Sequence, residues 1–296
     1  LEVIETAPGR VEPRCPHFGQ CWGCSLQHLD PQEQIASKQN TLQQNLLRIG
    51  KVRPEEYWAP LTGPLWGYRR KARLSVRYVH KKERVLVGFR ERYGRFVADM
   101  QECHVLDERI AGQLTALSEL IYSLEARRTI PQIEVACGDE KCALVFRHLE
   151  PLSDDDLEKL KAYAVHSGIA VMLQPGGPAT VNGLQPNEVQ LGFSFPEFGL
   201  DLEFAPSDFI QVNAAMNRSM VSRALELLDP DPDDRILDLF CGLGNFTLPI
   251  AGKAGEVVGV EGDAELVRKA TENAARNGLD NVRFFTADLT EEPGAA

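Results

Sequence analysis

The stretch ILDLFCGLGNFTLPIA, residues 236–251, decides the fold of the C-terminal part of the chain, together with VVGVEGD at 257–263. The apolar run before the glycines predicts a buried strand, and the residues after them predict a helix. The same order is repeated downstream, which predicts a parallel α/β sheet with right-handed crossovers. The expected elements are a helix at 214–228, strands at 235–240, 256–261 and 282–288, a helix directly after the glycine turn, and a helix at 264–278.

The turn after the first of these strands carries Gly242 and Gly244, which let a ligand approach the backbone closely. Glu261 ends the next strand 17 residues after Gly244, where an acidic side chain can hydrogen-bond ribose hydroxyls. The dinucleotide pattern G-x-G-x-x-G fails at its third glycine, which is Thr247 here. We therefore favour S-adenosylmethionine over NAD as the ligand of this turn, with the segment ADL at 287–289 on the adenine side.

Two further features belong to this part of the chain, one within the turn and one just before the expected helix at 214–228. Cys241 lies within it, and we interpret its thiol as lining the cofactor pocket rather than as a nucleophile. The stretch SDFIQVN at 207–213 alternates Gln211 and Asn213 with apolar residues. This alternation predicts a linker strand along a cleft.

Composition limits the class of protein. At 296 residues and 43% hydrophobic content the chain can form two globular domains. It has no apolar run long enough for a membrane span and no signal peptide at its start, so we expect a cytoplasmic protein without a membrane partner. In that reducing compartment seven cysteines indicate metal binding or redox chemistry rather than a disulfide framework. The first residue is Leu and the end reads EEPGAA, which we interpret as a fragment of a longer protein.

The region before the α/β pattern predicts an α+β domain. A long amphipathic helix is expected at about 30–49, and an antiparallel hairpin or meander at 68–98 around a turn near 80–84. Further strands are expected at 132–137, 142–148, 169–174 and 200–204, helices at 107–124 and 153–167, and a loop at 175–187.

Three cysteines lie within ten positions in CPHFGQCWGCSLQH, residues 15–28, and a fourth stands in CHVL downstream. Four thiolates can hold a tetrahedral zinc or an iron–sulfur cluster, and the spacing alone leaves both open. Gly19 and Gly23 allow the loop to fold around a bulky ligand. Cys137 and Cys142 bracket a turn between two expected strands, and we interpret them as ordinary hairpin residues.

A basic stretch stands out against the net charge of −11 and is opposed only by Glu83 and Glu91. Interleaved aromatic residues could stack on unpaired bases, so the stretch predicts a positive face for RNA, with a solvated strand face as the alternative. Its aromatic members are Tyr68, Tyr78, Phe89 and Tyr93, and its basic members are Arg69, Arg70, Lys71, Arg73, Arg77, Lys81, Lys82, Arg84, Arg90, Arg92 and Arg95.

Taken together, these motifs resemble the RNA uracil-5 methyltransferases, and most closely those members that modify 23S ribosomal RNA. The resemblance runs through nearly the whole chain: CPHFGQCWGCSLQH, YRRKARL, GFRER, ECHVL, FIQVN and DLFCGLGNFTLPIA occur in order. It implies an α+β central iron–sulfur domain plus a truncated α/β Rossmann-like S-adenosylmethionine-dependent methyltransferase domain. The implied boundaries are a remnant of an OB/TRAM barrel at 1–13, the central domain at 14–208 and the methyltransferase part at 209–296. Within the central domain, the segment of about 29–58 is implied to pack on the methyltransferase domain.

The resemblance also implies two ligand sets. A [4Fe-4S] cluster rather than zinc is implied on Cys15, Cys21, Cys24 and Cys103. Contacts to S-adenosylmethionine are implied for Gln211, Phe240, Asn245, Glu261 and Asp288.

In the family, a cysteine attacks C6 of uracil, the resulting enolate takes the methyl group at C5, and a base removes the C5 proton. The sequence up to Ala296 lacks the Asp-Pro-Pro segment, that cysteine and that base. We therefore expect no catalytic residue in residues 1–296, a nucleophile and base beyond Ala296, and no activity from this piece alone.

The expected parent protein is a monomer that methylates C5 of a uridine in 23S ribosomal RNA. One alternative is a tRNA-directed uracil-5 methyltransferase, against which the cluster cysteines argue. The other is an iron–sulfur RNA-binding module without enzymatic activity, which would have no use for S-adenosylmethionine.

Overall fold

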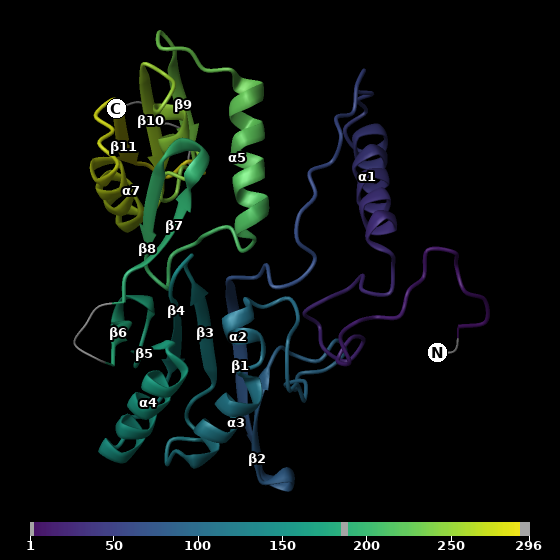
Figure 1. Ribbon diagram of the computed structural model, residues 1–296, viewed down its shortest axis with the longest axis vertical. Coiled ribbons are helices and arrows are strands. Elements are labelled where there is room, and N and C mark those ends of the chain that lie inside the picture. The colour runs from purple at the N-terminus through teal and green to yellow at the C-terminus, as the bar shows by residue number, and fades with distance from the viewer. Residues whose placement is uncertain (1–2, 185–188, 291–296) are drawn as a thin grey trace.

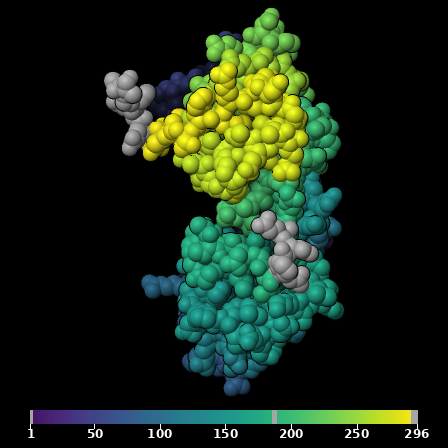
Figure 2. Space-filling model, turned by 90° about the vertical axis from the view of Figure 1, so that its left-hand side faces the viewer, coloured from purple at the N-terminus to yellow at the C-terminus, as the bar shows by residue number. Residues whose placement is uncertain are grey.

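The computed structural model describes residues 3–184 and 189–290, which form two lobes, one above the other in Figures 1 and 2. The lower lobe is built on a six-stranded sheet and the upper lobe on a three-stranded parallel sheet. A two-stranded hairpin packs with the upper lobe. None of the described helices is both long and apolar enough to cross a bilayer.

The sheet of the lower lobe has the strand order β2-β1-β3-β4-β5-β6, in which β4 and β5 run parallel and the other neighbours antiparallel. Its strands are β1 (Lys71–Val79), β2 (Arg84–Gly88), β3 (Gln132–Cys137), β4 (Cys142–Arg147), β5 (Ala170–Gln174) and β6 (Asn182–Gly183). Along β1, buried Leu74 and Val76 alternate with exposed Arg73 and Arg77. This period of two places one face of the strand on the core.

Three helices cover this sheet or connect its strands: α2 (Glu108–Ala111), α3 (Leu114–Ser123) and α4 (Asp154–Ser167). Leu114, Leu117 and Ile121 are fully buried on the core-facing side of α3, which packs against β2. At the start of α4, Asp156 accepts hydrogen bonds from the backbone N–H groups of residues 125 and 126. These bonds tie α4 to the segment that ends α3.

The N-terminal helix α1 (Pro31–Arg48) begins at Asp30, whose side chain accepts from the backbone N–H of Gln32, and it buries none of its residues. In Figure 1 it stands to one side of both lobes. The segment after it returns toward the upper lobe. There Arg223 lies over the ring of Trp58 at 6.0 Å, and Gly63 lies close to Met216.

The hairpin of β7 (Leu191–Phe195) and β8 (Leu200–Phe204) buries Phe193 and Phe195 in the core of the upper lobe. It docks on α7 (Ala264–Arg276) through two side-chain amides. Asn273 and Asn277 each donate to one backbone carbonyl of β8 and accept from one of its N–H groups.

The parallel sheet of the upper lobe has the order β11-β10-β9. Its elements are α5 (Ala214–Leu228), β9 (Arg235–Leu239), α6 (Thr247–Ala251), β10 (Glu256–Glu261), the helix α7 and β11 (Val282–Thr286). Alternating strands and helices with parallel pairing give the Rossmann-like α/β arrangement that the sequence predicts. On β9, Leu237 and Leu239 are 59% and 49% exposed, so one apolar face of the sheet is open among the described residues.

The structure confirms most of the expected elements and corrects several. The predicted helix at 107–124 is two helices, because Asp107 caps α2 and Gly112 ends it. Strand β7 was not expected, the helix after the glycine turn has five residues, and 207–213 forms no regular strand. The expected loop at 175–187 contains a short 3-10 helix and β6, and its residues 185–187 lie outside the described part.

The segment 1–13, interpreted as a barrel remnant, contains no strand in its described residues 3–13. Its described pairing is a single bridge between Arg10 and Leu29.

Candidate functional site

The glycine turn after β9 has an unusual backbone. Phe240, Gly242 and Gly244 have φ angles of 61°, 55° and 89°. A Cβ at Gly244 would lie 2.9 Å from the side chain of Leu248, so only glycine fits there. Phe240 has no such freedom, and its ring is 66% exposed. A strained backbone that presents an exposed aromatic ring at a glycine turn points to a binding role.

Glu261 closes the turn from the end of β10. Its carboxylate accepts hydrogen bonds from the backbone N–H of Gly242 at 3.0 Å and of Gly262 at 2.7 Å.

Asp288 follows the third strand of the sheet. The backbone carbonyl of Glu261 accepts from the N–H of Ala287, the residue directly before Asp288, at 3.0 Å. The Thr290 hydroxyl and N–H hold the pKa of Asp288 below its usual range. Phe240, Glu261 and Asp288 thus follow the carboxyl ends of three neighbouring parallel strands, the edge where α/β sheets bind ligands.

Asn245 is joined to α5 by a reciprocal pair of amide hydrogen bonds with Asn217, at 2.7 and 3.0 Å. Asn217 is 2% exposed and is not among the site residues expected from the sequence. The available signal was its place in the stripe Asn217, Val221, Leu225, whose other two members are apolar. Gln211 lies two residues before Asn213, which caps α5. Because Asn217 of the same helix is bonded to Asn245, α5 links the segment of Gln211 to the glycine turn.

Cys241 lies under the turn and is 4% exposed. Burial, with Asp238 and Glu261 nearby, raises the pKa of its thiol to about 12. Burial also raises the pKa of Asp238, although that carboxylate accepts a hydrogen bond of 2.6 Å from Thr247. A buried thiol with a raised pKa is almost wholly protonated at neutral pH and is a poor nucleophile, which agrees with our interpretation of Cys241.

The four thiols of the predicted metal site line one small hollow in the lower lobe, together with His17 and Met100. They belong to Cys15, Cys21, Cys24 and Cys103, and all four are free. Backbone hydrogen bonds join residues 20 and 22 of their loop to residues 92 and 90 after β2. Burial raises the pKa of Cys15 and Cys103, and that of Cys21 to about 11.

The spacing of these sulfur atoms is wide for one metal ion. Four thiolates around zinc at about 2.3 Å would lie about 3.8 Å from one another. Among the described residues, the group of three potential ligand atoms lying within 4.8 Å of one another is Asp107, Cys137 and Cys142, and not a set of the loop thiols.

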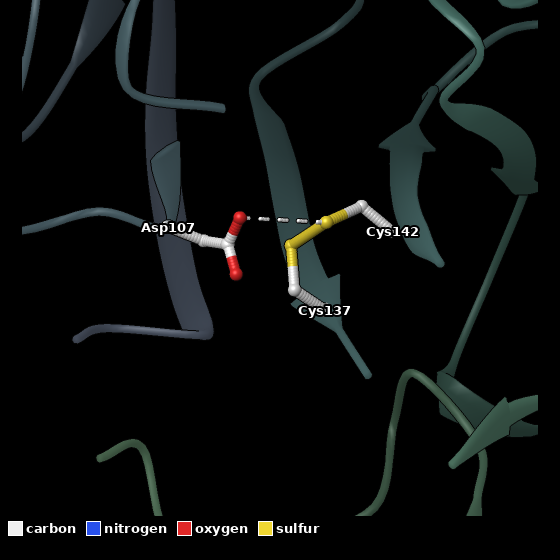
Figure 3. A group of neighbouring side chains, drawn as sticks. All are labelled: Asp107, Cys137 and Cys142. Carbon is white, nitrogen blue, oxygen red and sulfur yellow. Dashed lines mark hydrogen bonds between the residues drawn. A yellow bond between two sulfur atoms is a disulfide. The ribbon is translucent and has the colours of Figure 1, made fainter. Parts of the chain in front are cut away.

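The group Asp107, Cys137 and Cys142 is shown in Figure 3. The two cysteines face each other across the β3–β4 hairpin, as expected of hairpin residues, and their sulfur atoms form a disulfide. Asp107 binds the guanidinium of Arg109 at 2.7 and 2.8 Å. Each of these three side chains is therefore already bonded to another group of the protein. We expected no disulfide framework among the seven cysteines. That expectation is corrected at one place, the β3–β4 hairpin, where Cys137 and Cys142 form a disulfide.

Eight of the eleven basic residues of the stretch fall into two groups, and Arg69, Arg77 and Lys81 belong to neither. Arg70 is only 5% exposed and Lys71 binds the backbone carbonyl of Asp208, so these two do not belong to an RNA-facing surface. Arg73 pairs with Glu134, and Lys82 and Arg84 pair with Asp99. The sequence could not show these partners because they are distant along the chain.

The second group lies after β2, in a loop that we call the arginine–aromatic loop, residues 90–96. Tyr93 and Phe96 are 89% and 73% exposed, and Arg92 lies 5.4 Å from the centre of the Tyr93 ring. Exposed Trp22 of the thiol loop is bonded to this loop through the carbonyl of Arg90. Within the described chain, no ion pair is formed by Arg90, Arg92 or Arg95.

Known proteins resemble this chain over most of its length. The family model described as tRNA (uracil-5-)-methyltransferase matches residues 32–292. The chain is 54% identical over 292 residues to the 23S rRNA (uracil(1939)-C(5))-methyltransferase RlmD of Xanthomonas oryzae pv. oryzae, covering 99% of this chain and 66% of that protein. It is 55% identical over 291 residues to the RlmD of Alkalilimnicola ehrlichii, covering 98% and 65%. The chain thus spans just under two thirds of the length of these relatives.

Among solved structures, the tRNA (uracil-54, C5)-methyltransferase of Pyrococcus abyssi in complex with S-adenosyl-L-homocysteine matches with a TM-score of 0.72. The match covers 100% of this chain and 70% of that protein at 19% identity, and it establishes the fold alone. Because the family model covers most of the chain, this chain belongs to the RNA uracil-5 methyltransferase family.

Proposed function

We propose that the natural protein carrying this chain transfers a methyl group from S-adenosylmethionine to C5 of a uridine in 23S ribosomal RNA. The observation that carries the proposal is the carboxyl edge of β9, β10 and β11, where Phe240, Glu261 and Asp288 meet beside the glycine turn. The identity of 54% to a 23S rRNA methyltransferase supports ribosomal RNA as the substrate.

Each residue of this edge has a chemical role in the proposal. Glu261 accepts the ribose hydroxyls, because its carboxylate is already held in place by the N–H groups of the turn. Asp288 lies on the adenine side, and the exposed ring of Phe240 packs against the cofactor. Asn245 and Gln211 supply amide groups from the turn and from the segment before α5. The bound cofactor supplies the electrophilic methyl group.

The nucleophile and the base belong, in this proposal, to a part of the protein beyond Ala296. The five free cysteines of the described chain are four thiols of the metal hollow and the buried Cys241 with its raised pKa. Because four of them are assigned to the metal hollow and Cys241 is buried with a raised pKa, the proposal gives none of them the attack on C6 of uracil. Residues 1–296 alone are accordingly expected to be inactive.

We further propose a [4Fe-4S] cluster on Cys15, Cys21, Cys24 and Cys103. Four free thiols around one hollow support such a ligand, and the resemblance to the 23S ribosomal RNA enzymes implies a cluster rather than zinc. The cluster would cross-link the thiol loop to the segment before α2. We assign it a structural role there.

RNA would approach the lower lobe at the arginine–aromatic loop, where three arginines and exposed aromatic rings stand together. Replacing Arg90, Arg92 and Arg95 by Ala should lower the slope of log K against log salt by roughly 0.7 for each lost phosphate contact. Arg73→Ala is the control, because Glu134 already neutralises that side chain. An unchanged slope in the triple variant would remove the loop from the RNA interface.

The proposal is tested by methyl transfer to RNA. The natural full-length protein, a cytoplasmic monomer in this proposal, is incubated with labelled S-adenosylmethionine and transcripts of 23S ribosomal RNA or tRNA. We expect 5-methyluridine in the ribosomal transcript alone. Methylation of tRNA alone would support the tRNA-directed enzyme, and RNA binding without cofactor binding would support a non-enzymatic module.

A further inference from the structure

The segment 205–213, which we call the cofactor linker, carries Gln211 and is held by two neighbouring cations of the lower lobe. Arg70 Nε donates to the backbone carbonyl of Gln211 at 3.3 Å, and the Arg70 N–H donates to the carbonyl of Val212 at 2.9 Å. Lys71 Nζ donates to the carbonyl of Asp208. Two side chains that are adjacent in sequence therefore hold two points of the linker.

The upper lobe holds the same linker from the other side. The carboxylate of Asp208 accepts from Lys269 of α7 at 2.7 and 2.9 Å and from the backbone N–H of Ala205 at 2.6 Å. Asp208 is 7% exposed, so these bonds are shielded from water. The linker is thus fixed between the two sheets rather than free to move with either.

The guanidinium of Arg70 has a second connection that leads to the glycine turn. It lies 3.4 Å from the carboxylate of Asp139, and Asp139 also accepts from Arg218 of α5 at 2.8 Å. The residue before Arg218 on α5 is Asn217, whose amide pairs with Asn245 of the turn. One buried cation is therefore linked both to Gln211 and, through α5, to Asn245.

Such a cation is costly in a protein interior. Arg70 is 5% exposed and its guanidinium lies 4.8 Å from the ring centre of Phe193. Burial lowers its pKa to about 10, so it remains charged at neutral pH. The desolvation of this guanidinium is offset by its contacts with Asp139 and with the carbonyl of Gln211, and these contacts fix the positions of both groups.

We propose that Arg70 is a positioning residue for the S-adenosylmethionine pocket, holding Gln211 through its carbonyl and Asn245 through Asp139, Arg218 and α5. The inference rests on the proposed function, because it assumes that the cofactor binds at this edge. It also reassigns Arg70 and Lys71 from RNA contact to the alignment of the two lobes.

The test compares Arg70→Met, Arg70→Lys and the control Arg73→Met in the natural full-length protein. Arg73 lies on the adjoining strand β1 but is exposed and contacts only Glu134 among charged groups. We expect Arg70→Met to raise the KM for S-adenosylmethionine about tenfold, within the loss that misplaced positioning groups cause, and to leave the KM for RNA unchanged. Arg70→Lys should recover part of the loss, and Arg73→Met should behave as the wild type.

Amide hydrogen exchange gives the readout that a merely structural role would not produce. In Arg70→Met, exchange should accelerate in residues 205–213 while the core of β3 and β4 stays protected. If Arg70→Met does not fold, Asp139→Asn replaces it, with the same expected change in cofactor KM.

Two results would overturn the inference. One is an unchanged cofactor KM in a folded Arg70→Met or Asp139→Asn protein, and the other is an equal rise in the KM for RNA. Cofactor binding by the wild type distinguishes a failure of this inference from a failure of the proposed function. If the wild type binds no S-adenosylmethionine, the proposed function is wrong, whereas normal binding by both wild type and variant refutes only the role of Arg70.

Discussion

The six-stranded sheet of the lower lobe and the three-stranded sheet of the upper lobe bury their residues very differently. All residues of β4 except Arg147 are buried, whereas β9 has no buried residue and leaves Leu237 and Leu239 largely exposed. The chemical groups of the candidate cofactor site lie on the second sheet, at the edge next to that open face. The lower lobe thus carries much of the stability of the chain, and the upper lobe carries the ligand-binding groups.

This difference predicts which changes affect stability and which affect cofactor binding. The largest effect is expected from Cys103→Ser, because Cys103 is 5% exposed and, in the proposed cluster, is the ligand that ties the thiol loop to the segment before α2. Anaerobically purified variant should lose the brown colour and nearly all iron, and its lower lobe should unfold at a lower temperature, since the cross-link is lost. Iron and sulfide analysis with a melting curve measures both.

Binding of S-adenosylmethionine provides the control for that variant. Because the cofactor edge lies on the other sheet, its affinity should change less than about twofold, provided that sites with no shared partners act independently. Stoichiometric zinc without iron in the wild type would contradict the cluster, and an equal loss of cofactor affinity would contradict the separation of the two lobes.

A smaller effect is expected in the upper lobe from Phe240→Gly, which should weaken cofactor binding and leave stability nearly unchanged. Glycine adopts the φ of 61° without strain, and the ring is already 66% exposed, so the free energy of unfolding should stay within about 1 kcal/mol of the wild type. Cofactor affinity should fall several-fold because the ring is lost. Denaturant unfolding and calorimetry give the two values.

Phe285→Gly is the matched control, an exposed phenylalanine of β11 that is not among the residues with positive φ. It should lose about 0.5–1 kcal/mol of stability without affecting the cofactor. If Phe240→Gly destabilised the protein as much and bound the cofactor normally, Phe240 would be a structural residue only.

The smallest effect is expected from Cys241→Ser. A thiol with a pKa of about 12 is a thiolate in about one molecule in 100,000 at pH 7, and the sign of the shift means that this fraction grows only as the pH rises toward 12. In the natural full-length protein, covalent capture of RNA containing 5-fluorouridine should therefore persist in the variant. Loss of the adduct would place the nucleophile at Cys241, contrary to the account.

The sequence predicted an element well where the alternation or helical spacing of apolar residues lies entirely within that element. The strands at 132–137 and 200–204 and the helix at 214–228 have the observed bounds. The break at Gly112 was missed because the apolar spacing continues through it. Strand β7 could have been found, since Leu191, Phe193 and Phe195 alternate with exposed or half-buried residues.

Residue roles that depend on distant partners could not be predicted. The sequence shows Arg69, Arg70 and Lys71 as three consecutive cations, but only the fold brings Asp139, Asp208 and Gln211 to the last two. The same limit applies to Asn217, whose partner lies 28 residues away. The thiol set and the glycine turn were easier to find, because each has most of its members within one short stretch.

We propose above that the carboxyl edge of β9, β10 and β11 binds S-adenosylmethionine, and calorimetry on the wild type and Glu261→Ala measures this binding. We expect one site in the wild type and a loss of about 10- to 100-fold in affinity in the variant, the value of charge-assisted hydrogen bonds to the ribose. The variant should remain folded, because Glu261 is half-exposed at the end of its strand. Equal affinity in the two proteins, or no binding to folded wild type, would contradict the claim.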